Sequence, residues 1–160
     1  SIFTEGEANR EAVHLGDSIS KVLNIVKPEL KSKNIQIQVR VDEGCVIQIN
    51  QSEIEQVILN LINNAAQALA NSTTLQRHIT IEANKVDKSI QLSVSDNGPG
   101  VSEEFKPLLF ELLSTTKQTG MGLGLWLCRH VVTRYGGSIH YDDIAGGGAR
   151  FVVKLPVAMK

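Results

Sequence analysis

The chain has 160 residues, of which 42% are apolar and 21% charged, which fits one compact domain with an ordinary soluble surface. Its 16 Lys and Arg residues nearly balance 17 Asp and Glu residues, so the formal net charge is −1. This balance and an aromatic content of only 4% argue against the basic, base-stacking surface of a nucleic-acid-binding protein.

The sequence also lacks the patterns of a secreted or membrane protein. No apolar run approaches the roughly 20 residues of a membrane span, and no basic-then-apolar signal opens the chain. Cys45 and Cys128 lie far apart without Cys or His at ligand spacing, which argues against a disulfide framework or a zinc site. We therefore expect a reduced, cytoplasmic domain without direct membrane contact.

The first part of the chain predicts a linker, a short strand and a helix. Residues 1–12 are polar and without a period, so we expect a linker there and the folded domain over residues 13–160. Residues 13–15 read as a strand. Gly16-Asp17-Ser18 predicts the N-cap of a helix that ends near Lys33.

The remaining elements follow from apolar periodicity. Alternation predicts strands at 35–41, 46–49, 79–83, 90–94, 139–141 and 151–155. The strongest helix runs from about Ser52 to Asn71, a short helix begins at Ser102-Glu103-Glu104, and a last helix covers Leu123 to Tyr135. This order predicts an α+β fold, a two-layer α/β sandwich with a mixed, mostly antiparallel sheet and helices on one face.

Four amides recur along one stripe of the strongest helix: Gln56, Asn60, Asn64 and Gln67. Amides beside a core are costly without partners, and an amide oxygen suits Mg²⁺ when phosphates and waters complete its shell. A stripe that simply faces solvent explains the pattern equally well, so the spacing leaves both interpretations open.

Asp96 is the second unusual position. Its parity with Ile90, Leu92 and Val94 places it on the apolar face at the end of a strand, where a carboxylate must accept hydrogen bonds. The amino group of adenine is a suitable donor, and Gly98 and Gly100 allow the backbone to come close to a flat ligand. An ordinary turn is the alternative, but no strand follows to complete a hairpin.

Gly120-Met121-Gly122-Leu123-Gly124-Leu125 opens the last helix and predicts a phosphate cradle of backbone N–H groups at the positive end of the helix dipole. Lys117 is close enough upstream to bring a cation to a terminal phosphate. The spacing is not that of a dinucleotide fingerprint, and no Gly-Lys-Ser/Thr of a P-loop is present.

Together, these segments resemble the catalytic, ATP-binding domain of bacterial sensor histidine kinases, a fold of the GHKL (Bergerat) superfamily that gyrase B shares. The resemblance covers roughly residues 13–157 and is nearest to the oxygen-sensing and nitrogen-regulatory kinases. The segments that carry it are Asn60 to Ala65 (N box), Asp96 to Gly100 (first glycine box), Phe110 with Thr115-Thr116-Lys117 (F box and lid), Gly120 to Gly124 (second glycine box), and Gly146 to Gly148 with Phe151 and Leu155-Pro156.

The resemblance implies ATP and Mg²⁺ as cofactors, with Asn64 as the metal ligand and Asn60 and Lys117 as catalytic residues. The implied nucleotide-binding residues are Asn60, Asn64, Asp96, Gly98, Gly100, Val101, Thr115, Thr116, Lys117, Gly120, Gly122, Leu123, Gly124 and Leu125. Segment 110–120 is expected to act as a lid that nucleotide orders.

The implied reaction transfers the γ-phosphoryl group of ATP to a His on a dimerisation domain outside this chain, for onward transfer to a response-regulator Asp. His14, His78, His130 and His140 do not match that acceptor and are interpreted as structural or surface residues. Asn60 occupies the position of a water-activating Glu in the related ATPases, so free hydrolysis should be slow. Expected partners are ATP or ADP, the dimerisation and phosphoacceptor domain, and the receiver domain of a response regulator.

Three positions depart from the family pattern: Leu112-Leu113 in the F box, Gln67 where a basic residue is common, and Ala149 where a hydroxyl is common. The alternative functions are a GHKL nucleotide-binding module without kinase activity, a GHKL ATPase that drives conformational change, and a protein-interaction domain. Asn60 argues against the ATPase, and the grouped glycine clusters argue against a pure interaction domain.

Overall fold

The computed structural model describes residues 9–112 and 122–157. Its elements in chain order are β1 (Glu11–His14), α2 (Leu15–Ser32), β2 (Ile35–Val41), β3 (Val46–Ile49), α3 (Gln51–Ala70), β4 (Arg77–Val86), β5 (Ser89–Asp96), the 3₁₀ helix η1 (Lys106–Leu108), α4 (Gly122–Arg134), β6 (Ser138–Asp143) and β7 (Ala149–Pro156).

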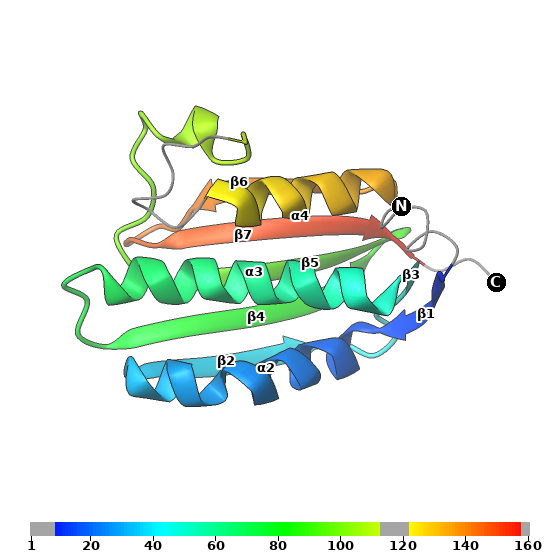
Figure 1. Cartoon of the computed structure of the whole chain (residues 1–160), viewed down its shortest axis with the longest axis horizontal. Coiled ribbons are helices and arrows are strands. Elements are labelled where there is room, and N and C mark those ends of the chain that lie inside the picture. Colours follow the sequence, from blue (N-terminus) through cyan, green and yellow to red (C-terminus); the bar gives the residue numbers. More distant parts are fainter. Residues whose placement is uncertain (1–8, 113–121, 158–160) are drawn as a thin grey trace.

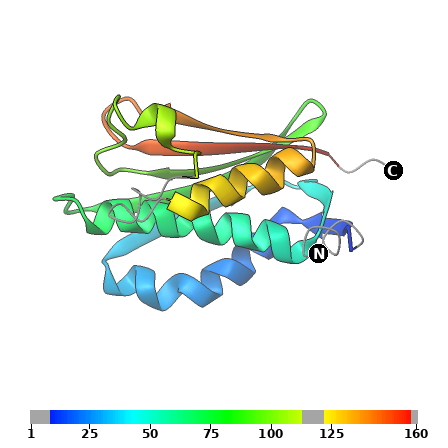
Figure 2. The ribbon, with the colours of Figure 1, turned by 45° about the horizontal axis from the view of Figure 1, so that its top comes forward.

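The described residues form two layers, a sheet and three α-helices that cover one of its faces (Figures 1 and 2). The five-stranded sheet has the order β2-β4-β5-β7-β6, in which only the pairing of β2 with β4 is parallel. A small antiparallel pair, β1 with β3, lies at one end. The predicted two-layer, mostly antiparallel α+β architecture is therefore confirmed.

Helix α3 lies between α2 and α4 (Figure 1), and its buried apolar residues belong to the core that it shares with the sheet. Side chains that are fully buried here include Ile54, Ile58, Leu61, Ile62 and Leu69 of α3. Full burial of one such side chain contributes about 1.5–3 kcal/mol, so α3 has a strongly fixed position. That rigidity matters because α3 also carries the polar residues of the candidate site.

The start of α2 differs from the sequence prediction. The helix begins at Leu15, directly after β1, and its N-cap residue His14 makes no capping bond through its side chain. The backbone N–H of Leu15 instead donates to the carbonyl oxygen of Cys45, 2.9 Å away. Because the β1–β3 pairing fixes where the helix starts, Asp17 and Ser18 fall inside its first turn and do not cap it.

The predicted short helix at Ser102-Glu103-Glu104 is also wrong. A turn covers residues 103–105, and the 3₁₀ helix η1 follows at Lys106–Leu108. Pro107 explains the difference, because it has no N–H to donate to a carbonyl four residues earlier.

Two further points concern the ends of the fold and membranes. β1 begins at Glu11, within the segment expected to be a linker, and residues 1–8 lie outside the described residues. In residues 9–112 and 122–157 there is no helix with the length and apolar character that a membrane span requires.

Candidate functional site

Asp96 lies buried at the end of β5, where its neighbours are Ile79 of β4 and Ala149 of β7. Only 4% of the residue is exposed, as its parity on the apolar face predicts. Burial raises the pKa of its carboxyl group, and backbone hydrogen bonds from Gly98 and Ala149 offset part of this shift. The Gly98 N–H donates to Oδ1 at 2.9 Å. The carboxyl group keeps acceptor capacity for a further donor.

The glycine-rich turns beside Asp96 pack backbone against backbone. Gly148 has φ +128°, and a Cβ atom there would lie 2.1 Å from the carbonyl oxygen of Asp96. Gly100 has φ +79°, and its Cβ would lie 3.1 Å from the carbonyl oxygen of Gly148. These two glycines therefore let the β6–β7 turn close over the end of β5, which fixes the surroundings of the carboxylate.

Gly98 differs from these two glycines because it contacts side chains. A Cβ atom at this position would lie 3.0 Å from Asp96 Oδ1 and 3.4 Å from Leu69 Cδ2. The first glycine segment, Asp96 to Gly100, therefore lies against the last part of α3, close to Leu69.

The amide stripe of α3 is only partly exposed to solvent. Gln56 and Gln67 are exposed, Asn60 is half-buried and Asn64 is buried, with 9% of its surface exposed. Within the described residues, Asn64 Oδ1 is buried and has no hydrogen-bond partner. Buried polar atoms normally have a partner, so this oxygen has the character expected of a ligand for a cation.

Asn60 connects α3 to the start of α4. Its Nδ2 donates to the carbonyl oxygen of Gly124 at 3.3 Å, and its Oδ1 accepts from Gln56 Nε2 at 2.9 Å. A Cβ atom at Gly124 would lie 3.8 Å from Asn60 Cβ, which is ordinary contact, so the two helices approach closely here. Asn60 therefore already has partners on both of its amide atoms.

The second glycine segment, Gly120 to Gly124, is described only from the start of α4 at Gly122. Leu125 is 1% exposed and packs in the core, so its side chain anchors α4. The expected lid and phosphate-binding residues Thr115, Thr116, Lys117 and Gly120 lie outside the described residues, as does most of segment 110–120.

Sequence reasoning missed a brace formed by Tyr141, Asp143 and Lys106. The Val101 N–H donates to Tyr141 Oη at 3.1 Å, and this hydroxyl donates to Asp143 Oδ1 at 2.7 Å. Lys106 Nζ donates to Asp143 Oδ2 at 2.6 Å. The brace holds the segment after Gly100 against β6, and the hydrogen bond from Lys106 lowers the pKa of Asp143.

Of the four histidines, His78 lies beside the Asp96 end of the site, where its backbone N–H donates to Asn97 Oδ1 at 2.8 Å. His14 and His78 are exposed, His140 lies 3.3 Å from an oxygen of Asp142, and the His130 ring stacks on Trp126 with 5.2 Å between ring centroids. Within the described ranges, no group of three His, Cys, Asp or Glu residues could hold a metal ion. Asn64 is a candidate metal ligand because of its buried, unpaired amide oxygen.

Comparison with known proteins agrees with this arrangement. Residues 49–159, which include α3, Asp96 and all three glycine segments, match the family described as "Histidine kinase-, DNA gyrase B-, and HSP90-like ATPase". The chain belongs to this family. The match confirms the resemblance drawn from the sequence and the ATP-binding character of the domain.

The relatives within this ATPase family are sensor kinases. The chain is 32% identical to the C4-dicarboxylate transport sensor protein DctS of Rhodobacter capsulatus, over 91% of this chain and 22% of that protein. It is 32% identical to the sensor protein FixL of Bradyrhizobium diazoefficiens, over 96% and 30%, and 35% identical to the sensor histidine kinase ZraS of Salmonella typhi, over 92% and 31%. The chain spans less than a third of the length of each of these curated relatives.

Solved structures of the same family have the same fold. The nucleotide-free catalytic domain of histidine kinase ThkA superposes with a TM-score of 0.81 at 27% identity, covering 92% of this chain and 95% of that one. The mycobacterial sensor histidine kinase MprB superposes with a TM-score of 0.78 at 25% identity, covering 92% and 97%.

Proposed function

We propose that this chain is the catalytic domain of a two-component sensor histidine kinase, which transfers the γ-phosphoryl group of ATP to a His outside this chain. The observation that carries the proposal is the order of contacts along α3. Leu69 lies beside the first glycine segment and Asp96, Asn64 presents a buried oxygen without a partner, and Asn60 contacts the start of α4.

The spacing of these contacts suits one extended nucleotide. Asn60 and Leu69 are nine residues apart in α3, or about 14 Å along the helix axis. We place the adenine at the Asp96 end, where the carboxylate accepts from the adenine amino group and Gly98 leaves room for the ring. The phosphates then extend toward Asn60 and the start of α4.

Asn64 lies between these two ends and is the proposed ligand of Mg²⁺. Its unpaired, buried amide oxygen fits a hard cation whose shell is completed by phosphate and water oxygens. When bound, Mg²⁺ would neutralise charge on the phosphates during phosphoryl transfer. The remaining nucleotide contacts are proposed for the second glycine segment, the segment that contains Thr115, Thr116 and Lys117, and the region of Gly100 and Val101.

Asn60 has a proposed role in keeping the phosphoryl group for the His acceptor. An amide cannot take a proton from water, and both amide atoms of Asn60 already have hydrogen-bond partners. We therefore propose slow hydrolysis of ATP and attack on the γ-phosphorus by a neutral His nitrogen, with Lys117 orienting the phosphate. The phosphoryl group would then pass to an Asp of a receiver domain.

The test mixes this chain with radiolabelled Mg-ATP and a dimerisation-helix fragment that carries a His acceptor. We expect label on the fragment that is labile in acid and stable in base, and none when the fragment His is replaced by Gln. At an ATP concentration below saturation, the Asp96→Asn variant should transfer much less label. If the chain binds ATP but never labels fragments from related sensor kinases, the nucleotide-binding module without kinase activity becomes the better description.

A further inference from the structure

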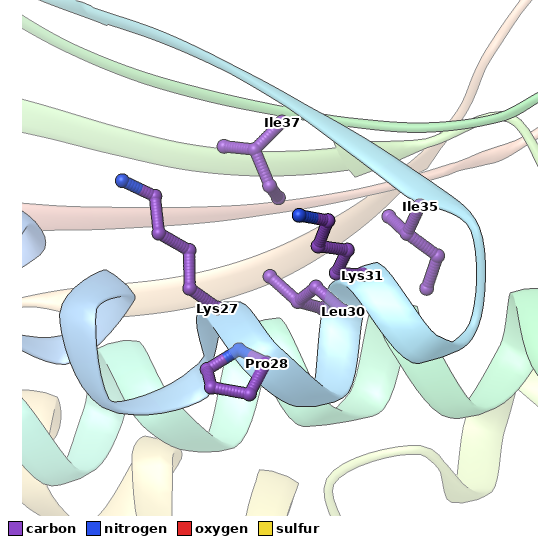
Figure 3. A pocket seen from close by; sticks show the side chains of 6 residues that line it. All are labelled: Lys27, Pro28, Leu30, Lys31, Ile35 and Ile37. Carbon is purple, nitrogen blue, oxygen red and sulfur yellow. The ribbon is translucent and has the colours of Figure 1, made fainter.

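An open groove lies between α2 and β2, away from the candidate nucleotide site. The cavity has a volume of about 560 Å³ and is lined by Lys27, Pro28, Leu30, Lys31, Ile35 and Ile37. Figure 3 shows Ile35 and Ile37 pointing from β2 into the gap, while the Lys27 and Lys31 side chains extend from α2 toward the strand. The groove therefore combines an apolar floor with two ammonium groups.

Strand β2 forms an edge of the five-stranded sheet. The N–H of Asp42 donates to the carbonyl oxygen of Ala83, and backbone groups in a strand alternate in direction. The N–H and C=O groups of Ile37 and Val39 therefore point away from β4, and no turn or loop backbone group of the described residues bonds to them. Val39, which follows Ile37 on the helix-facing side, is 41% exposed.

The two lysines carry positive charge that the described part of the chain does not balance. Its ion pairs do not include Lys27 or Lys31, and the intervening Glu29 pairs with Lys33 at 2.9 Å. Lys27 and Lys31 are four residues apart, which is about 6 Å along the helix. Alternate side chains of an extended strand are about 6.6 Å apart, so they match this spacing.

We infer that β2 is a docking edge for an extended acidic peptide segment of a partner protein, added to the sheet as a further strand. Two carboxylates at alternate, inward-facing positions would reach Lys27 and Lys31, and their methylene groups would cover Ile35 and Ile37. An aliphatic side chain two residues further on would cover Val39. Main-chain hydrogen bonds to β2 provide affinity, and the lysines select acidic sequences.

A second copy of this chain fits the edge less well. Pairing β2 with β2 would bring the lysines of both copies to one interface, where they repel each other. Strand β2 itself, Ile35–Val41, has no carboxylate to offer them. The charge of the groove thus favours an acidic partner strand.

The test uses NMR and calorimetric titration with a synthetic acetylated peptide, Thr-Glu-Thr-Glu-Thr-Val-Thr, and the same peptide with Lys in place of Glu. We expect the acidic peptide to shift backbone amides of β2 and the end of α2, and the basic peptide to leave them unmoved. Lys27→Glu with Lys31→Glu should weaken binding about tenfold or more, whereas Lys154→Glu on β7 serves as the matched control. Val39→Pro removes an outward N–H, so it should abolish binding, and Val39→Thr should retain it.

Nucleotide binding and circular dichroism of each variant establish that it is folded. The inference is overturned if the acidic peptide leaves β2 unshifted at millimolar concentration, or if the charge reversal has no more effect than Lys154→Glu. It is equally overturned if Val39→Pro folds and still binds the peptide, if the edge instead takes fatty acid or anionic vesicles with equal dependence on the lysines, or if light scattering shows that β2 pairs two copies of the chain.

Discussion

The side-chain amide of Asn60 donates to the carbonyl oxygen of Gly124 at 3.3 Å, which ties the middle of α3 to the first turn of α4. One residue before the end of the same helix, Leu69 lies within contact distance of the position that a Cβ of Gly98 would take. One rigid helix therefore positions both glycine segments relative to each other. The proposed nucleotide site depends on this relationship.

Asp96→Asn should change how the stability of the fold depends on pH. Burial raises the pKa of this carboxyl group above the ordinary 3.8, so ionisation is harder in the folded than in the unfolded state. The carboxyl group therefore favours folding most below pH 3.8, and this contribution is lost as the pH rises through its folded-state pKa. The free energy of unfolding of the wild type, measured relative to that of Asp96→Asn, should therefore decrease from acid pH to pH 7.

Urea denaturation of both proteins at several pH values between 3.5 and 7 measures this difference, with the pH range chosen about the ordinary Asp pKa. We expect Asp96→Asn to equal or exceed the wild type in stability at pH 7. A wild type whose advantage over the variant grows as the pH rises would contradict the burial argument.

Asn64→Ala should remove the dependence of nucleotide binding on magnesium. The side-chain oxygen is buried without a partner in the described structure, so its removal should change the free energy of unfolding by less than about 1 kcal/mol. Calorimetry with ATP in magnesium and in EDTA should show that magnesium strengthens wild-type binding at least about tenfold and that the variant lacks this effect. Gln67→Ala, at an exposed position of the same stripe, is the control. If both variants lose the magnesium dependence of ATP binding equally, the role of Asn64 is refuted.

Gly148→Ala should be far more harmful than Gly146→Ala. Both glycines have positive φ, but a Cβ at 148 would lie 2.1 Å from the Asp96 carbonyl oxygen, whereas nothing lies within 4 Å at 146. Both substitutions cost about 1–2 kcal/mol for the backbone conformation, and the clash should add at least about 1 kcal/mol at 148. Thermal unfolding and ATP affinity measure this, and equal effects would mean that the turn does not close over β5.

Tyr141→Phe should loosen the segment after Gly100 without disturbing the core. It removes the acceptor of the Val101 N–H and the donor to Asp143, so we expect a loss of about 1 kcal/mol of stability. Hydrogen exchange at Val101 should become faster, and the affinity for ATP should fall several-fold as well. Unchanged exchange at Val101 would show that the brace does not hold this segment.

Much of the fold follows from local pattern. The alternation of Ile35, Ile37 and Val39 and the burial parity of Asp96 are properties of neighbouring residues, and both predict the observed structure. The parallel pairing of β2 with β4 was not predicted, because it depends on the path of α3 between the two strands. The predicted start of α2 was wrong for a similar reason, because the carbonyl of Cys45, which is distant in the sequence, accepts from Leu15 and helps to set the observed start.

In the candidate site, too, local features were predicted from the sequence and long-range contacts were not. Sequence identified Asn64, Asp96 and Gly98 because amides on a helix stripe and a carboxylate on an apolar face are locally unusual. It could not choose between a solvated and a buried stripe, and the burial of Asn64 now favours the ligand interpretation. The brace went unnoticed because Tyr141 looks like an ordinary inward-facing strand residue until Val101 lies next to its hydroxyl.

The most direct measurement is a calorimetric titration of this chain and of Asp96→Asn with ATP in the presence of magnesium. The account predicts saturable binding of one ATP to the wild type and a roughly 10- to 100-fold weaker affinity for the variant, because a charge-assisted hydrogen bond to adenine is lost. GTP, which presents an oxygen acceptor in place of the adenine amino group, should bind the wild type weakly. No heat with ATP, or equal affinity of the wild type and the variant, would contradict the placement of adenine at Asp96.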